Sequence, residues 1–129
     1  MPTPAARPQR DCVPIPAGRD WDAVRVPRSV GLTALSILGA RSGAVLEDPG
    51  ALALYWFVPA GAAADWAVTN TRPIGRGTFV VIPPPLRIEG PGPHWRICPT
   101  DGTWTTQPGA LQAAIEAALN PAMGRASAS

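Results

Sequence analysis

Residues 71–96, with the sequence TRPIGRGTFVVIPPPLRIEGPGPHWR, constrain the fold more than any other part of the chain. A β-rich run over residues 78–82 follows a glycine turn and stops at three consecutive prolines. Because proline lacks the N–H that a strand ladder needs, the prolines must end this strand. A second glycine-proline turn then leads to another short strand, expected over residues 95–98. The segment therefore predicts short strands joined by tight turns.

A β-hairpin is predicted just upstream of this segment. Residues 44–46 and 52–58 are both β-capable, and Asp48-Pro49-Gly50 between them is a typical turn sequence. The second strand is almost wholly apolar, which indicates burial on both faces. Residues 60–70 are expected to form a loop or short helix that carries Trp66.

Two helices are predicted, one on each side of these strands in the sequence. The first begins at Pro27 and ends at Gly39, which suits a left-handed C-cap, and the second is capped near Thr106. The apolar faces are Val30, Ala34, Ile37 and Leu38, with Leu35 beside them, in the first helix, and Leu111, Ile115 and Leu119, widened by Ala114 and Ala118, in the second. Asp101-Gly102 is expected to form a tight turn. These elements predict an α+β fold, a small and mostly antiparallel sheet with helices packed on one face.

The chain of 129 residues has room for one small core. Residues 1–20 and 120–129 are rich in proline and small or polar residues without periodicity, so we expect a disordered N-terminal arm and a disordered C-terminal tail around one α+β domain over residues 21–119. The Ala, Pro, Gly and Arg content suits a high-GC genome, such as an actinobacterial one. All 11 basic residues are arginine, and the formal net charge of +2 is too small to predict a dedicated nucleic-acid binder by itself.

Several classes of site and location are disfavoured by what the chain lacks. No apolar segment approaches the roughly 20 residues that span a bilayer, so we expect a cytoplasmic protein without a membrane partner. Cys12 and Cys98 are the only cysteines, and Cys12 lies in the expected arm, which argues against a disulfide framework. His94 and Cys98 are too few for structural zinc, and no phosphate-binding GxxxxGK[ST] loop is present, so we expect neither metal nor cofactor.

Three blocks of sequence occur in an order that is typical of one family. LALYWFVP is followed by TRPIGRGTFVVIPPP and then by GPGPHWR. Together they resemble the second half of the bifunctional primase-polymerase N-terminal domain, of the archaeo-eukaryotic primase type. The likeness covers roughly residues 50–96. Structural needs also explain most matched positions, since the glycines permit tight turns and the prolines end a strand.

The resemblance implies a site for divalent metal and an incoming nucleotide, but the residues that would form it differ here. Ala53 stands where the family has a histidine that helps to hold the nucleotide, and Arg72 stands near the position of an aspartate. Glu47 and Asp48 are the only nearby carboxylates, and as neighbours in an extended chain they would point to opposite sides. Two-metal phosphoryl transfer needs clustered oxygen ligands. We therefore expect no enzyme activity, although a residual metal role for Glu47 or Asp48 stays open.

The candidate ligand-binding residues all lie in or beside the opening segment. Arg72, Arg76, Arg87 and Arg96 could converge at the glycine turns into an anion-binding patch. His94 belongs to the same set, and Trp95 either forms a stacking platform beside Arg96 or is buried to seal the sheet.

Two functions follow from these observations. The first is a non-catalytic primase-polymerase-like module, binding or regulatory, that contacts a nucleotide, DNA or another partner through its arginines and glycine turns. The alternative is a small accessory protein that binds a protein partner through exposed aromatic and proline residues, with no nucleic-acid role. The near-neutral charge suits the alternative.

Overall fold

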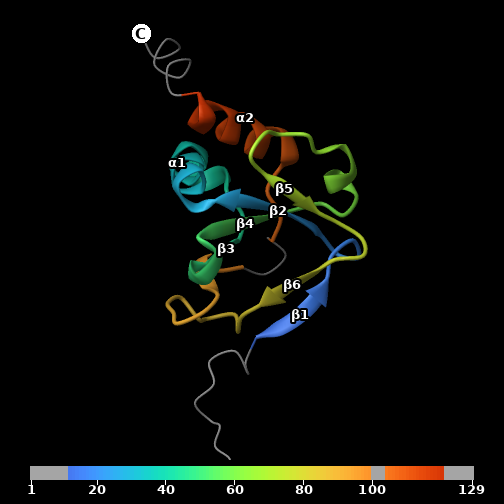
Figure 1. The fold of residues 1–129 in the computed structure, drawn as a ribbon, viewed down its shortest axis with the longest axis vertical. Helices are drawn as coiled ribbons and strands as arrows, with labels where there is room; N and C mark the ends of the chain where they lie inside the picture. The colour runs from blue at the N-terminus through green and yellow to red at the C-terminus, as the bar shows by residue number, and fades with distance from the viewer. Residues whose placement is uncertain (1–11, 100–103, 121–129) are drawn as a thin grey trace, which may run out of the picture.

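The computed structural model describes residues 12–99 and 104–120. It has the α+β architecture predicted from the sequence: a five-stranded antiparallel sheet, two helices on one of its faces, and a separate two-stranded sheet on the other (Figure 1). The expected Asp101-Gly102 turn, residues 1–11 of the expected arm and residues 121–129 of the expected tail lie outside the described residues.

The strands of the larger sheet lie in the order β5-β2-β4-β3-β7, and each pairs antiparallel with its neighbours. The strands and helices, in chain order, are β1 (Val13–Pro16), β2 (Asp22–Pro27), α1 (Arg28–Leu38), β3 (Val45–Asp48), β4 (Ala53–Val58), β5 (Arg72–Ile74), β6 (Phe79–Ile82), β7 (His94–Ile97) and α2 (Pro108–Leu119). Short 3-10 helices are η3 (Gly39–Arg41), η4 (Pro49–Ala51) and η5 (Ala62–Asp65). β4, the most apolar strand of this sheet, lies at its centre, as its composition predicts.

The first core cluster fills the space between the sheet and the two helices. It joins Val24 and Val26 of β2, Leu54 and Trp56 of β4, and Leu111 of α2, among others. The predicted hairpin and both predicted helices are confirmed, with Gly39 at positive φ after α1. Ile37, however, is exposed, and Gly31 takes its place in the buried face together with Ala34 and Leu38. The second helix is capped by Gln107, whose Oε1 accepts from the Ala110 N–H, instead of by Thr106.

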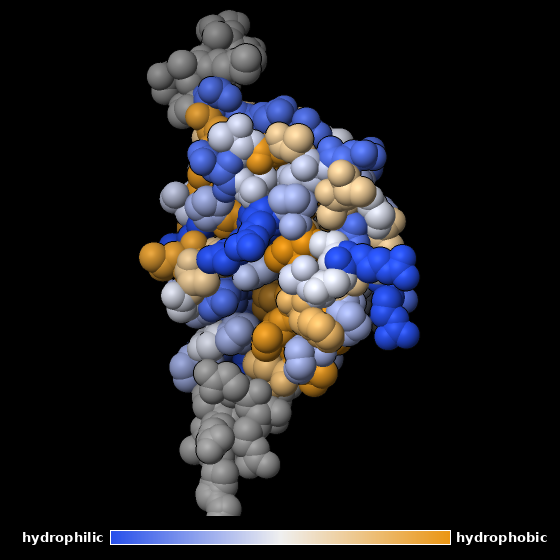
Figure 2. Space-filling model, turned by 45° about the vertical axis from the view of Figure 1, so that its right-hand side comes forward, coloured by the Kyte–Doolittle hydropathy of each residue, from blue (hydrophilic) through white to orange (hydrophobic). Residues whose placement is uncertain are grey.

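The second core cluster lies on the opposite face of the sheet and is rich in aromatic rings. Trp21, Phe57, Trp95 and Trp104 contact one another with centroid separations of 4.8 to 6.4 Å. The two-stranded β1–β6 sheet packs on this face through Val80 and Ile82. On the surface that Figure 2 shows, hydrophobic residues gather in the lower half, beside strongly hydrophilic side chains at mid-height.

Three expectations about the strands were wrong or incomplete. Residues 12–20 are not a disordered arm, because β1 pairs with β6 and Ala17 is buried. β6, the strand predicted over residues 78–82, lies outside the main sheet. β2 and β5 were not predicted at all, although β2 pairs on both sides. Neither described helix is long and apolar enough to cross a bilayer.

Candidate functional site: a pocket between the two sheets

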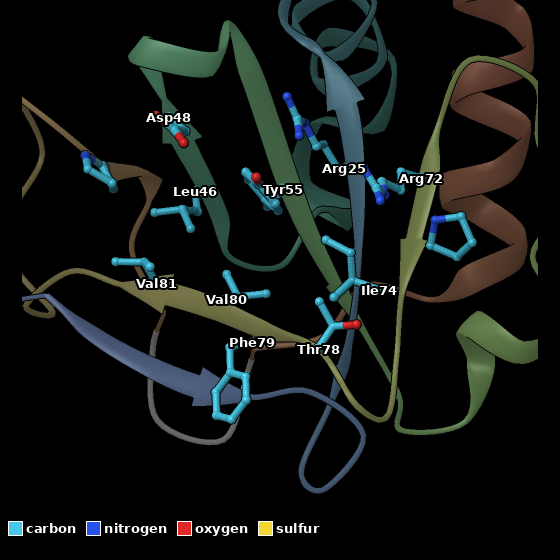
Figure 3. A pocket seen from close by; sticks show the side chains of 12 residues that line it. Arg25, Leu46, Asp48, Tyr55, Arg72, Ile74, Thr78, Phe79, Val80 and Val81 are labelled. Atoms are coloured by element: carbon cyan, nitrogen blue, oxygen red, sulfur yellow. The ribbon is translucent and has the colours of Figure 1, made fainter.

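A pocket of about 380 Å³ lies between the larger sheet and β6, on the face away from the helices (Figure 3). Its ionisable side chains come from four neighbouring strands, Thr78 lines it just before β6, and its other walls are mainly apolar. The lining residues are Arg25, Leu46, Asp48, Tyr55, Arg72, Pro73, Ile74, Thr78, Phe79, Val80, Val81 and Pro93. The volume falls at the lower end of the roughly 300–1,000 Å³ that small-molecule sites occupy.

Strand register brings the polar residues together. Arg25 of β2 stands opposite Arg72 of β5 on one side and opposite Tyr55 of β4 on the other. Because side chains directly opposite in antiparallel strands share one face, these three form a row across the sheet. Figure 3 shows the two arginines side by side, with Tyr55 between them and Asp48.

The pair of arginines leaves the pocket with an unbalanced positive charge. Within residues 12–99 and 104–120, neither guanidinium forms a hydrogen bond or an ion pair. Like charges in directly opposed positions destabilise a sheet. An anion between the two guanidiniums would remove that repulsion and accept their N–H donors.

Burial and the charges of the pocket both affect the pKa of the Tyr55 hydroxyl. Burial raises the pKa of its hydroxyl above 10.0, and the negative charge of Asp48 acts in the same direction, whereas Arg25 and Arg72 lower it. The hydroxyl therefore stays protonated at neutral pH and can donate a hydrogen bond into the pocket.

Glu47 lies on the opposite, helix-facing side of β3, as the alternation of an extended strand predicts. Glu47 is only 4% exposed, and its carboxylate accepts from Arg28 Nε at 2.6 Å and from an Arg96 terminal nitrogen at 2.7 Å, while His94 Nε2 lies 3.5 Å away. Burial alone would raise the pKa of Glu47, but the hydrogen bonds and charges of Arg28 and Arg96 outweigh burial and lower it below 4.5. Glu47 and Asp48 thus cannot act on one ligand.

Of the two alternatives that the sequence left open for Trp95, the stacking platform is not formed. Trp95 is 1% exposed, its indole N–H donates to the Pro84 carbonyl at 3.0 Å, and its ring packs against Phe57 and Trp104. The alternative interpretation, in which the tryptophan seals the sheet, is the one the structure supports. Arg96 beside it is bound to Glu47.

The four arginines that could have formed one anion-binding patch do not all lie together. Arg72 lines the pocket between the sheets, whereas Arg96 and His94 contact Glu47 on the other face. Arg76 lines a different cavity, of about 400 Å³, together with Asp22 and Gly75. Arg87 lies in the loop after the prolines, where its carbonyl accepts from the Trp95 N–H. Of the six residues predicted from the sequence, only Arg72 lines the pocket.

Ala53, at the position of the family's histidine, is buried and carries no polar group toward a ligand. Among the described residues, no three His, Cys, Asp or Glu side chains are grouped to hold a metal ion. Both cysteines are free.

Comparison with family models, with curated proteins and with solved structures gave no match. The likeness to primase-polymerase domains therefore depends on the three sequence blocks alone.

Sequence reasoning missed Arg25 and Tyr55. In residues 22–26 the apolar Val24 and Val26 flank Arg25, a pattern that indicates a strand with the arginine on the other face from the two valines. This pattern could have identified Arg25 as a candidate binding residue. Tyr55 is the only polar side chain of the apolar strand β4, which marks it as a residue with an accessible face.

Proposed function

We propose that the chain is a non-catalytic binding module, related to primase-polymerase domains, that holds a nucleotide in the pocket between its two sheets. The observation that carries the proposal is the opposed pair Arg25 and Arg72, which lines a pocket and has no anionic partner among the described residues. Guanidinium groups bind phosphate oxygens through paired, charge-assisted hydrogen bonds.

Binding without catalysis follows from the acidic groups near the pocket. Two-metal phosphoryl transfer requires several carboxylates on one side of the substrate. Asp48 is the only described carboxylate that lines the pocket, and Glu47 is held by two arginines on the other face. A nucleotide fits the pocket better than DNA does, because a volume of about 380 Å³ is that of a small-molecule site. A cytoplasmic location, where nucleotides are abundant, belongs to the same proposal.

Isothermal titration calorimetry with AMP and ATP at low ionic strength tests the proposal. We expect the wild-type chain to bind at least one of them. The affinity of Arg72→Gln should be at least about tenfold lower, since one phosphate contact is lost. Arg19→Gln, which removes an exposed arginine outside the pocket, is the matched control and should bind like wild type. Absence of binding by the wild-type chain, or equal losses in the two variants, would contradict the proposal.

A protein-binding role is the second candidate, and a specific surface favours it. An apolar groove of about 590 Å³ is lined by residues that include Ile15, Pro84 and Trp104, and Leu86, on the loop after the prolines, is 85% exposed. Leu86→Glu should abolish capture of a partner that wild type retains in crosslinking, without changing nucleotide binding. A partner captured equally by both proteins would count against this surface.

A further inference from the structure

The polar groups of the pocket are separated by charge. Arg25 and Arg72 occupy one end, Asp48 lies at the other, and Tyr55 stands between them (Figure 3). A ligand that fills the pocket must therefore be anionic at one end and a hydrogen-bond donor at the other.

The arginine end matches one terminal phosphate. Two guanidiniums supply two positive charges, and a phosphomonoester carries about −1.5 to −2 at neutral pH. Charge is thus balanced by a single phosphate group. Its oxygens can accept from both guanidiniums and from the Tyr55 hydroxyl, which remains protonated at that pH.

The Asp48 end disfavours a second or third phosphate. An ionised carboxylate only accepts hydrogen bonds, so it suits the hydroxyls of a sugar or the amino group of a base. It repels phosphate, most strongly where the surroundings exclude water. Asp48 is half-buried, and its side chain makes no capping hydrogen bond to the following turn, so its carboxylate is not committed there.

The space between the two ends is walled by apolar side chains. Ile74, Val80 and Val81 line it, and Phe79 stands at its edge with a largely exposed ring. A flat heterocycle can pack on such walls. In a pocket of about 380 Å³, a longer phosphate chain would push either the ring away from these walls or a phosphate toward Asp48.

We infer that the pocket selects a nucleoside monophosphate over the corresponding di- and triphosphate. Arg25 and Arg72 bind the phosphate, the apolar walls hold the base, and Asp48 accepts from hydroxyl or amino donors while it repels further phosphates. This inference rests on the proposed function and specifies the ligand of the same site.

Calorimetric titration of the full chain with AMP, ADP, ATP and ribose 5-phosphate at low salt tests the inference. We expect AMP to bind at least about tenfold more tightly than ATP, with ADP between them. Ribose 5-phosphate, which shares the phosphate and the hydroxyls but lacks the base, should bind more weakly than AMP. Equal binding of AMP and ribose 5-phosphate would replace the nucleotide with a sugar phosphate and overturn the inference.

A variant of Asp48 tests the preference for the monophosphate with a change that a merely structural role would not produce. Asp48→Asn keeps the size of the side chain but removes its charge, so it should raise ATP affinity and narrow the ratio between AMP and ATP several-fold. Asp65→Asn, an exposed acidic residue in η5 outside the pocket, is the matched control and should leave the ratio unchanged. Arg25→Gln should weaken the binding of every phosphate ligand.

The outcomes separate the inference from the proposed function. If ATP binds as tightly as AMP to wild type, or if Asp48→Asn leaves the ratio unchanged, the monophosphate preference is overturned while nucleotide binding stands. If no nucleotide binds to the wild-type chain, the proposed function is overturned as well.

Discussion

Arg25 and Arg72 stand directly opposite each other on the neighbouring strands β2 and β5, an arrangement that lowers the stability of the ligand-free chain. Binding sites commonly retain such unfavourable groups because a ligand compensates them. Arg72→Gln should therefore raise the free energy of unfolding of the ligand-free chain by about 0.2–1 kcal/mol while it weakens phosphate binding. Urea unfolding at low ionic strength measures the gain.

The increase in the free energy of unfolding of Arg72→Gln should be smaller in about 0.5 M NaCl, since salt screens the repulsion between the two guanidiniums in the wild-type chain. Arg19→Gln, whose site is exposed and outside the pocket, should leave stability nearly unchanged at either salt concentration. A loss of stability in Arg72→Gln would show that the arginine is structural and would weaken its assignment to the site.

Glu47 makes stability depend on acid pH. Its pKa is lowered in the folded chain, so the unfolded chain binds more protons once pH falls toward the ordinary value of 4.5. The stability that Glu47 contributes is complete above that pH and is lost as pH falls through the folded-state pKa. Glu47→Gln should cost about 1–3 kcal/mol at pH 7 and flatten the acid slope in urea unfolding.

The control for Glu47 is Glu116→Gln, which removes an exposed carboxylate on α2 and should keep the wild-type slope. Parallel pH profiles for wild type and Glu47→Gln would mean that Arg28 and Arg96 do not stabilise the carboxylate.

At the scale of elements, α1 packs closely on the sheet because it carries a glycine at its buried face. A Cβ at Gly31 would lie 2.8 Å from Leu54 Cδ1, and Leu54 is fully buried. Gly31→Ala should therefore lower the free energy of unfolding by roughly 1–2 kcal/mol, because overpacking outweighs the helix propensity of about 1 kcal/mol that alanine adds.

The added Leu54→Val change should recover part of the loss in Gly31→Ala, since it removes a methylene from the crowded contact. Ser36→Ala, on the exposed face of the same helix, should not destabilise the chain. A Gly31→Ala variant more stable than wild type would contradict the close packing of α1.

The elements that could be predicted from the sequence are those whose local signals agree. The β3–β4 hairpin has a turn between two apolar runs, and both helices have caps and apolar faces. β1 could not be predicted because Pro14 and Pro16 interrupt it, yet an edge strand with one partner tolerates prolines. β2 contains Asp22 and Arg25, so its sequence indicates a strand but does not indicate that the strand pairs on both sides.

At the scale of the whole molecule, the two-layer fold was predictable, but the small sheet on the second face was not. Residues 79–82 are all apolar, so their sequence alone does not tell which sheet they join or which side is buried. The pocket is formed between the two sheets, and Arg25 and Tyr55 enter it only through register. Of the polar residues in the site, the sequence therefore singled out only Arg72 as a ligand-binding candidate and Asp48 as a possible metal ligand.

The docking of β6 on the sheet can be tested with neighbouring valines. Val80 is 4% exposed and packs in the second core cluster, whereas Val81 is 44% exposed. Val80→Ala should lower the free energy of unfolding by about 1–3 kcal/mol, and Val81→Ala by less than about 0.5 kcal/mol. Equal losses in urea unfolding would contradict the position of the small sheet.

Titration of the chain with AMP, followed by ¹H–¹⁵N NMR, shows whether one nucleotide site lies between the two sheets. We expect saturable shifts concentrated at Arg25, Tyr55 and Arg72, with little change at His94 and Arg96 beside Glu47 on the other face. Shifts concentrated at His94 and Arg96, or no saturable shifts at any residue, would contradict a nucleotide site between the sheets.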